Sequence, residues 1–259
     1  MLNTILATLL IASLSFATTI NLNNDNNINM RGEVSDESVN NWQIEIAEKV
    51  AKRGNSSYPI YLSIDSPGGS IDAGLAFIEF AKTIPNLHTI TLFGASMASG
   101  IQQALPGKRY VLGTSITMFH RAKGGFEGQF GDGEVESRLD MAKQIVSILE
   151  QQNASRMKLP LAEYKQLVKD EYWIAGGSNN LSKNAADEVV SLVCDNALIQ
   201  ASTVETFRVF IFTINVRFSK CPLFRSGSVQ KQSEDAYLKN KAAFQRKMTG
   251  IYYFQATSN

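Results

Sequence analysis

The hydrophobic positions of this chain fall into short runs typical of strands and longer runs with the spacing of helices. The stretch "DESVNNWQIEIAEKVAKRG" has apolar residues at helical spacing from Val39 to Val50, with Asp36 or Ser38 as its N-cap. The runs "YPIYLSID" and "LHTITLF" are short and β-rich, and each is followed by a turn and a helical pattern. Strands that alternate with helices predict an α/β fold with a largely parallel sheet.

The second half of the chain continues this alternation with weaker signals. "KRYVLG" and "SITMFH" predict two further short strands, and "KGGFEGQFGDGE" predicts an extended Gly-rich segment. The longest helical pattern is "VESRLDMAKQIVSILEQQNASRM", and "LPLAEYKQLVKDEYWI" starts a shorter helix. "RVFIFTINVRF" alternates strictly and predicts one strand. The Asn-rich "TTINLNNDNNIN" predicts a loose segment, and the polar, basic tail carries no structural signal.

The first 17 residues, "MLNTILATLLIASLSFA", have a pattern of their own. An apolar run from Ile5 to Ile11 precedes small residues, with Ser15 and Ala17 at positions suited to cleavage of a signal peptide. No Lys or Arg stands before the run, so a buried strand or an uncleaved anchor are the alternatives. We predict a signal peptide over residues 1–17 and an exported protein, periplasmic or secreted, with the cytoplasm as the alternative location.

Composition narrows the possible functions. With 259 residues, 44% hydrophobic and 19% charged, the chain is typical of a globular protein with one main domain. A net charge of +1 without a long basic stripe argues against a nucleic-acid partner. The two cysteines, Cys194 and Cys221, match no metal-site spacing. They are a candidate disulfide in an exported protein and two buried thiols in the cytosol.

The candidate chemistry centres on serine and histidine. A serine hydroxyl is a poor nucleophile until a base takes its proton, and histidine is the usual base near neutral pH. The chain has only two histidines: His88 opens a strand, whereas His120 closes one. In the stretch "FGASMASG", Ser96 and Ser99 also follow a strand. Because sites in α/β sheets gather at the carboxyl ends of strands, His120 is the candidate base. The alternative for either serine is a helix N-cap.

The turn "SPGGS" lies between a strand and a helix and suits an oxyanion hole. Pro67 fixes the turn, its glycines let a substrate backbone approach, and the start of the following helix is electropositive. Acyl transfer needs backbone N–H groups aimed at a developing negative charge. Such turns also occur as plain connections, so this motif gains weight only beside the others.

The blocks "YLSIDSPGGSIDAGLAFIEF", "GASMASG", "GKRYVLGTSITMFHRAKGGFEGQ" and "DEYW", in this order, resemble the proteolytic subunit of the Clp protease family. This family belongs to the Clp/crotonase superfamily, and the resemblance covers about residues 28–193. It implies an α/β fold of repeated ββα units. The long helix looks like the family's protruding handle, through which two rings of subunits pack. The implied activity is that of a serine peptidase with a Ser-His-Asp arrangement.

The nucleophile is the point where this chain departs from the family. Counted from Gly94, the family's serine falls on Ala98, so an alignment gap is needed. Ser96 keeps "ASM" and the alanine eight residues downstream in register. Ser99 keeps a closer count from the strand and the "ASG" of related signal-peptide peptidases. We favour Ser96 over Ser99, and Met97 then supplies one oxyanion N–H.

The resemblance assigns further roles by position. His120 falls on the family's histidine, and Gly68 would supply the other oxyanion N–H. The segment "GGFEGQ" would pair with an extended peptide substrate by strand addition, which makes substrate-binding candidates of three residues. These are Gly124, Gly125 and Phe126.

The acid of the triad is the least determined member. The family places an Asp two residues before an aromatic residue, and in "KDEYW" Glu171 stands at that offset with Asp170 one position earlier. Either carboxylate could orient the imidazole, and the one that does not is an exposed helix-end acid. We choose Asp170 because the shorter acid is the commoner partner, with Glu171 as the alternate.

These inferences divide the chain into four parts. Residues 1–17 are the signal peptide, 18–193 the peptidase domain, 194–223 a C-terminal strand extension pinned by the cysteines, and 224–259 a basic tail.

The predicted function is that of a serine endopeptidase acting on peptides or unfolded proteins, assembled into a homo-oligomeric ring. The alternatives are a catalytically silent assembly subunit and a crotonase-type acyl-CoA enzyme. We expect no cofactor or metal, and an ATP-driven unfoldase partner only in the cytosol. The chain has no P-loop of its own.

Overall fold

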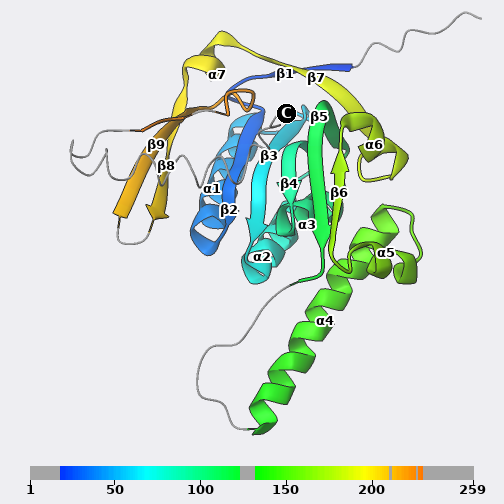
Figure 1. Cartoon of the computed structure of the whole chain (residues 1–259). Coiled ribbons are helices and arrows are strands. Elements are labelled where there is room, and N and C mark those ends of the chain that lie inside the picture. The colour runs from blue at the N-terminus through cyan, green and yellow to red at the C-terminus, as the bar shows by residue number, and fades with distance from the viewer. Residues whose placement is uncertain (1–17, 123–131, 210–211, 226, 230–259) are drawn as a thin grey trace, which may run out of the picture.

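The structure is a computed structural model, and it describes residues 18–122, 132–209, 212–225 and 227–229. A seven-stranded sheet has the order β1-β7-β5-β4-β3-β2, with β6 beside β5 (Figure 1). All its pairs are parallel except the antiparallel pair of β5 and β6. The strands are β1 (Thr18–Leu22), β2 (Asn27–Val34), β3 (Ile60–Gly69), β4 (Leu87–Ala95), β5 (Arg109–His120), β6 (Glu171–Ala175) and β7 (Glu188–Cys194). The predicted α/β fold with a largely parallel sheet is confirmed.

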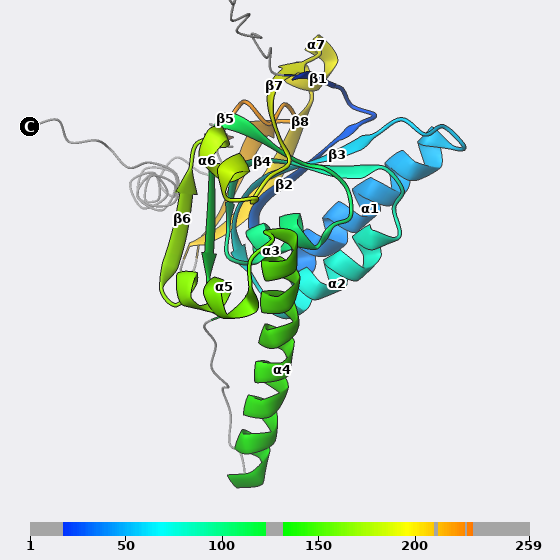
Figure 2. The ribbon, with the colours of Figure 1, turned by 90° about the vertical axis from the view of Figure 1, so that its right-hand side faces the viewer.

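Helices cover one face of this sheet, and one helix leaves the body of the molecule. α1, α2 and α3 lie against the sheet, while α4 projects far beyond it (Figure 2). The core between sheet and helices is formed by alternate strand residues such as Leu62 and Ile64, packed on helix residues such as Trp42 and Phe77. The helices are α1 (Asp36–Arg53), α2 (Ile71–Lys82), α3 (Met97–Ala104), α4 (Asp132–Arg156), α5 (Leu161–Leu167), α6 (Gly177–Ser182) and α7 (Asn196–Gln200).

Local side-chain chemistry fixes where α1 begins. The N-cap is Ser35, whose hydroxyl accepts the N–H of Ser38, while the hydroxyl of Ser38 accepts the N–H of Ser35. This reciprocal capping box satisfies two backbone donors that the first turn leaves without helical partners. The prediction of a helix here is confirmed. The predicted cap, Asp36 or Ser38, is wrong, because the serine just before them has the extended backbone that an N-cap requires.

Two further predictions, one near the middle and one near the start of the chain, are wrong. The segments "KRYVLG" and "SITMFH" form one strand, β5. The hydroxyl of Ser115 bridges the junction between them, because it accepts the N–H of Leu112 and donates to the carbonyl of Thr91 on β4. The Asn-rich segment predicted to be loose contains β1 and the start of β2. Polar strands of this kind are stable at sheet edges, where one face or edge meets solvent.

The segment predicted as a single strand near the C-terminus forms parts of two. β8 (Ser202–Val209) and β9 (Phe212–Ser219) are antiparallel neighbours, and β10 (Ser228–Val229) completes a three-stranded sheet in the order β10-β9-β8. Apolar alternation continued through "RVFIFTINVRF" without a Gly or Pro to mark the change of direction. The predicted signal peptide, residues 1–17, and the tail from residue 230 on lie outside the described residues.

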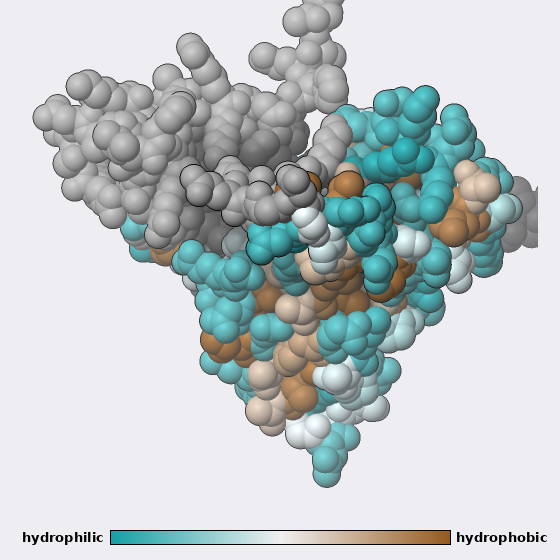
Figure 3. Space-filling model, turned by 90° about the horizontal axis from the view of Figure 1, so that it is seen from below, coloured by the Kyte–Doolittle hydropathy of each residue, from teal (hydrophilic) through white to brown (hydrophobic). Residues whose placement is uncertain are grey.

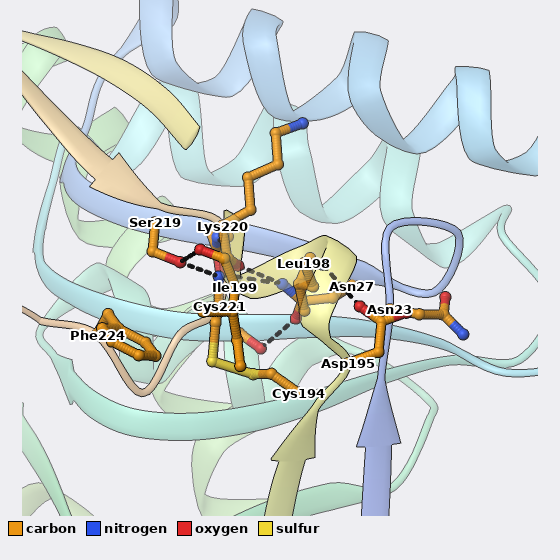
Figure 4. The surroundings of a disulfide bond; sticks show 12 residues. Asn23, Asn27, Cys194, Asp195, Leu198, Ile199, Ser219, Lys220, Cys221 and Phe224 are labelled. Carbon is orange, nitrogen blue, oxygen red and sulfur yellow. Dashed lines mark hydrogen bonds between the residues drawn. A yellow bond between two sulfur atoms is a disulfide. The ribbon is translucent and has the colours of Figure 1, made fainter. Parts of the chain in front are cut away.

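The cysteines connect the seven-stranded sheet to this C-terminal part. Cys194 ends β7, Cys221 follows β9, and their sulfur atoms are bonded at 2.06 Å (Figure 4). The disulfide packs in an apolar cluster with Leu22 and Leu198. No helix of the described part is long and apolar enough to span a bilayer.

Candidate active site

Ser96 lies in a sharp turn between β4 and α3. Its backbone φ of 56° and ψ of −123° fall in a region that residues other than glycine rarely adopt. The turn is held because the N–H of Ser96 donates to the carbonyl of Met118 on β5, at 2.9 Å. The hydroxyl makes no capping bond to the helix that follows. A strained backbone that presents a side chain in this way is typical of a functional position.

The hydroxyl of Ser96 meets the imidazole of His120. Ser96 Oγ lies 2.7 Å from His120 Nε2, within hydrogen-bond distance. The contact follows from topology, since β4 and β5 are parallel neighbours and both residues lie at the carboxyl ends of these strands. With the serine as donor, Nε2 is the unprotonated nitrogen of a neutral imidazole. This arrangement can transfer the serine proton to the ring.

Ser99 lies in a different environment from Ser96. Its side chain is fully buried, and its hydroxyl donates to the carbonyl of Gly94 at 2.7 Å. This bond ties the first turn of α3 to the end of β4. The structure brings Ser96 to the imidazole, while the hydroxyl of Ser99 is occupied in a structural hydrogen bond.

The Gly-rich turn at the end of β3 lies directly against the Ser96 turn. A Cβ atom at Gly68 would approach within 2.5 Å of the Ala95 carbonyl oxygen and 2.8 Å of the Met97 nitrogen. Gly68 also has a φ of +89°, so both its conformation and its surroundings require glycine. The two expected oxyanion residues, Gly68 and Met97, are thus neighbours in space.

Their N–H groups differ in how they are used. The N–H of Met97, the first residue of α3, has no acceptor within the described part of the chain. The N–H of Gly68 donates to the hydroxyl of Ser66 at 3.1 Å, and Ser66 is fully buried. One of the two donors is therefore available in this structure, and the other is engaged within its own turn.

Neither candidate acid hydrogen-bonds the imidazole in this structure. Glu171, the first residue of β6, pairs directly opposite His120 on β5, so both side chains lie on the same face of the sheet. Its carboxylate accepts a hydrogen bond from the indole N–H of Trp173 at 3.0 Å. Asp170 is exposed and lies immediately before β6.

An apolar shelf that sequence reasoning missed lies beside His120. It consists of Phe93, Ala95 and Met118, with the ring of Trp173 6.5 Å from that of Phe93. Trp173 is 46% exposed, which is unusual for so large an apolar ring. The sequence did contain a signal for this shelf. Met118 lies two residues before His120, and Trp173 lies two residues after Glu171, and residues two apart in a strand share one face.

Gly124, Gly125 and Phe126 lie outside the described residues. Within the described ranges, no group of three or more His, Cys, Asp or Glu side chains has the arrangement of a metal site.

Comparison with known proteins identifies the family of this chain. The sequence model of the family described as "Clp protease" matches residues 13–190, more than half of the chain. The chain belongs to the Clp protease family. One curated relative is the "ATP-dependent Clp protease proteolytic subunit 1" of Leifsonia xyli subsp. xyli (strain CTCB07), 36% identical over 125 residues. That match covers 45% of this chain and 60% of the relative, less than two thirds of its length.

The extent of the Clp protease match separates two parts of the structure. The Ser96 turn, the Gly68 turn, His120 and both candidate acids lie within it, as does the whole of α4. The match ends at residue 190, inside β7, so α7, the three-stranded sheet and both cysteines lie outside it. The resemblance noted in the sequence is confirmed, and the part of the chain after residue 190 lies outside the family match.

Proposed function

We propose that this member of the Clp protease family is a serine endopeptidase that hydrolyses peptides or unfolded proteins. The observation that carries the proposal is the 2.7 Å contact between Ser96 Oγ and His120 Nε2 at a strained strand-to-helix turn. A hydroxyl and an imidazole in this contact form a nucleophile and its base. The family to which the chain belongs supports a peptidase.

The chemistry proceeds by two acyl transfers. Ser96 Oγ attacks the carbonyl carbon of the scissile bond while His120 Nε2 takes the hydroxyl proton. The tetrahedral intermediate collapses as the C–N bond breaks, and His120 returns the proton to the departing amine. A water molecule then gives its proton to His120 and attacks the acyl-serine, which releases the carboxylate product and restores the serine.

The oxyanion is held by the N–H groups of Met97 and Gly68. Among the described residues, the N–H of Met97 at the start of α3 has no acceptor. Gly68 exchanges its bond to the Ser66 hydroxyl for one to the oxyanion. This exchange is favourable because a hydrogen bond to a charged acceptor is roughly twice as strong as one between neutral groups.

Asp170 is our proposed third member, with Glu171 as the alternate. Its role is to orient the imidazole and to stabilise its charged form during proton transfer. Asp170 directly precedes Glu171, the residue that pairs with His120, so the backbone before β6 would have to turn its exposed carboxylate toward the ring. Glu171 would first have to release the indole of Trp173.

The substrate is an extended chain. Gly124, Gly125 and Phe126 would pair with it by strand addition. The apolar shelf, with the Trp173 ring near Phe93, would receive an apolar side chain. Strand addition requires a peptide without competing structure, which favours peptides and unfolded proteins over folded ones.

Two alternative functions are less well supported. A silent assembly subunit has no need of a serine in a strained conformation, which costs of the order of 1–3 kcal/mol, beside a histidine. A crotonase-type acyl-CoA enzyme would use the oxyanion N–H groups without a serine–histidine pair.

Export is the second part of the proposal. A disulfide between Cys194 and Cys221 supports an oxidising compartment, as does the predicted signal peptide. In such a compartment the protein acts without an ATP-driven unfoldase.

The exposed handle predicts self-association. α4 carries large apolar side chains that are about half exposed. Seen from below, the side to which α4 projects, the surface has an interrupted band of hydrophobic residues, drawn in brown (Figure 3). These residues are Val135, Leu139, Met141 and Ile148. We expect Leu139→Glu to shift the protein from a large assembly to smaller species in sedimentation velocity, because a charge in an apolar contact is costly.

Gln144→Glu is the matched control, since it adds the same charge at an exposed polar position of α4. It should leave the assembly unchanged. A wild-type protein that sediments as a monomer at micromolar concentration would refute the ring.

Labelling with a fluorophosphonate tests the proposed activity. The reagent phosphonylates only a serine whose proton is accepted by a neighbouring base, so the wild-type protein should be labelled, and peptide mapping should find the label on Ser96. Hydrolysis of an unstructured reporter peptide should be lost in step with labelling. An assembled, folded sample that neither takes the label nor cuts the peptide would favour the silent subunit.

A further inference from the structure

A segment of the C-terminal part lies across the two strands at the edge of the main sheet. We call residues 220–225, which follow β9, the strap. The side-chain amides of Asn27 and Asn29 donate to the carbonyl of Lys220 at 3.2 and 2.7 Å, and the guanidinium of Arg31 donates to the carbonyl of Phe224 at 3.2 Å. These three side chains alternate along β2 and so share the face opposite the helical core.

The last residue of the strap, Arg225, forms an ion pair with a buried carboxylate on β3. Arg225 Nη2 lies 2.6 Å from Asp65 Oδ1, and Arg225 Nε lies 3.3 Å from Oδ2, a two-point contact. The Asp65 side chain is only 6% exposed, and Arg31 Nε lies 3.7 Å from its Oδ2. A carboxylate buried this deeply requires cationic partners, and a paired guanidinium also fixes its direction.

Asp65 is adjacent to the turn that carries the proposed oxyanion donor. The next residue, Ser66, accepts the N–H of Gly68 through its hydroxyl. Gly68 packs closely against the Ser96 turn, since a Cβ atom at this position would lie 2.5 Å from the Ala95 carbonyl oxygen and 2.8 Å from the Met97 nitrogen. The direction of the Gly68 N–H therefore depends on where Asp65 and Ser66 hold the end of β3.

The other end of the strap is tied covalently. Cys221 is its second residue, and its bond to Cys194 fixes it to the end of β7 (Figure 4). The hydroxyl of Ser219, just before the strap, donates to the carbonyl of Ile199 at 2.7 Å. Only three residues separate Cys221 from Arg225, so the disulfide limits how far the guanidinium can leave Asp65. Both cysteines and Arg225 lie outside the family match.

We propose that Arg225 is a positioning residue for the Gly68 turn and that the Cys194–Cys221 disulfide holds it there, so that hydrolysis requires the oxidised pair. This inference rests on the proposed peptidase function. Reduction by a dithiol breaks the S–S bond, which takes up two electrons and two protons to give two thiols, while the dithiol is oxidised to its cyclic disulfide. The strap then loses its covalent anchor.

The strap offers an internal control for this role. Lys220 and Arg225 both have side chains that are 36% exposed, but Lys220 pairs with Glu45 on α1 at 3.6 Å and not with the turn. Removing Lys220 deletes a partly exposed ion pair, which contributes little to stability. Removing Arg225 takes one cation from a buried carboxylate, so we expect a lower Tm for that variant. Arg31 stays beside Asp65 when Arg225 is lost, so the Arg225→Ala variant is expected to fold.

The decisive experiment compares Arg225→Ala, Arg225→Lys and Lys220→Ala in kcat, KM and Tm with an unstructured reporter peptide. We expect Arg225→Ala to lower kcat about tenfold and to change KM by no more than about twofold. This loss of kcat is smaller than the loss on removing an oxyanion donor, which is about 10²–10³-fold. Arg225→Lys should recover part of this loss, and Lys220→Ala should match the wild type. A dithiol should lower the kcat of the wild type about as much as the Arg225→Ala substitution does. It should lower the kcat of Arg225→Ala only slightly, because the two changes act on the same contact.

Hydrogen exchange of the amides between residues 62 and 70 supplies a readout independent of catalysis. The Gly68 and Gly69 amides should exchange faster in Arg225→Ala and in the reduced wild type, but not in Lys220→Ala. Equal exchange and equal kcat in Arg225→Ala and Lys220→Ala would overturn the positioning role. If the wild type has no hydrolytic activity, the proposed function fails, and the exchange pattern alone then decides whether Arg225 positions the turn.

Discussion

Replacing Ser96 by alanine is expected to abolish peptide hydrolysis, with a loss of at least about 10⁴-fold in kcat. The reason is that Ser96 alone among the candidate serines has its Oγ on the imidazole, 2.7 Å from His120 Nε2. Fluorophosphonate labelling should disappear with the activity. Alanine also suits this strained turn no worse than serine does, so the fold should persist and Tm should change little.

Ser99→Ala is the matched control for this variant. It removes the buried bond from Ser99 Oγ to the Gly94 carbonyl, which should cost about 1 kcal/mol of stability and leave kcat near the wild-type value. A lower Tm with intact hydrolysis is therefore the expected combination. Full activity in Ser96→Ala together with none in Ser99→Ala would move the nucleophile to Ser99.

His120→Ala should damage hydrolysis about as much as Ser96→Ala, because the two side chains act as one unit. The double variant is the sharper measurement: its kcat should equal that of either single variant. If the two losses multiply instead, Ser96 and His120 contribute separately, and the proton-transfer mechanism proposed for them is wrong.

The second histidine supplies the control for His120. His88 lies at the start of β4, at the opposite end of the strand from the Ser96 turn, and its Nδ1 accepts the N–H of Lys108 at 3.0 Å. Burial lowers the pKa of His88, and the charge of Lys108 acts in the same direction, so both favour the neutral ring. His88→Ala should lower Tm while hydrolysis continues.

The main sheet and the serine–histidine pair could be predicted because each depends on information carried close together in the sequence. Apolar periodicity defined β3, α2 and β4 within short windows. The meeting of Ser96 with His120 then followed from parallel topology, since both end adjacent strands. The choice between Ser96 and Ser99 depended on a backbone angle, which residue types alone do not determine.

The acid and the C-terminal part could not be predicted for different physical reasons. Whether Asp170 or Glu171 orients the imidazole depends on side-chain rotamers and on competition from the Trp173 indole. The contact between Asp65 and Arg225 joins residues 160 positions apart, and no periodic pattern encodes such a pair. No Gly or Pro separates β8 from β9 in the sequence, so the strict alternation did not reveal that two strands are present.

The pairing of β1 with β7 has a consequence for how the protein matures. Thr18 aligns with Val190 and Leu22 with Cys194, so the first described strand finds its partner only near the end of the domain. Contacts between such distant segments form slowly, because a long chain must be brought together first. A chain emerging from the ribosome therefore cannot complete its sheet edge, and the cysteine that binds to Cys194 is made later still. If hydrolysis requires the strap, nascent chains stay inactive, which spares the cell that makes them.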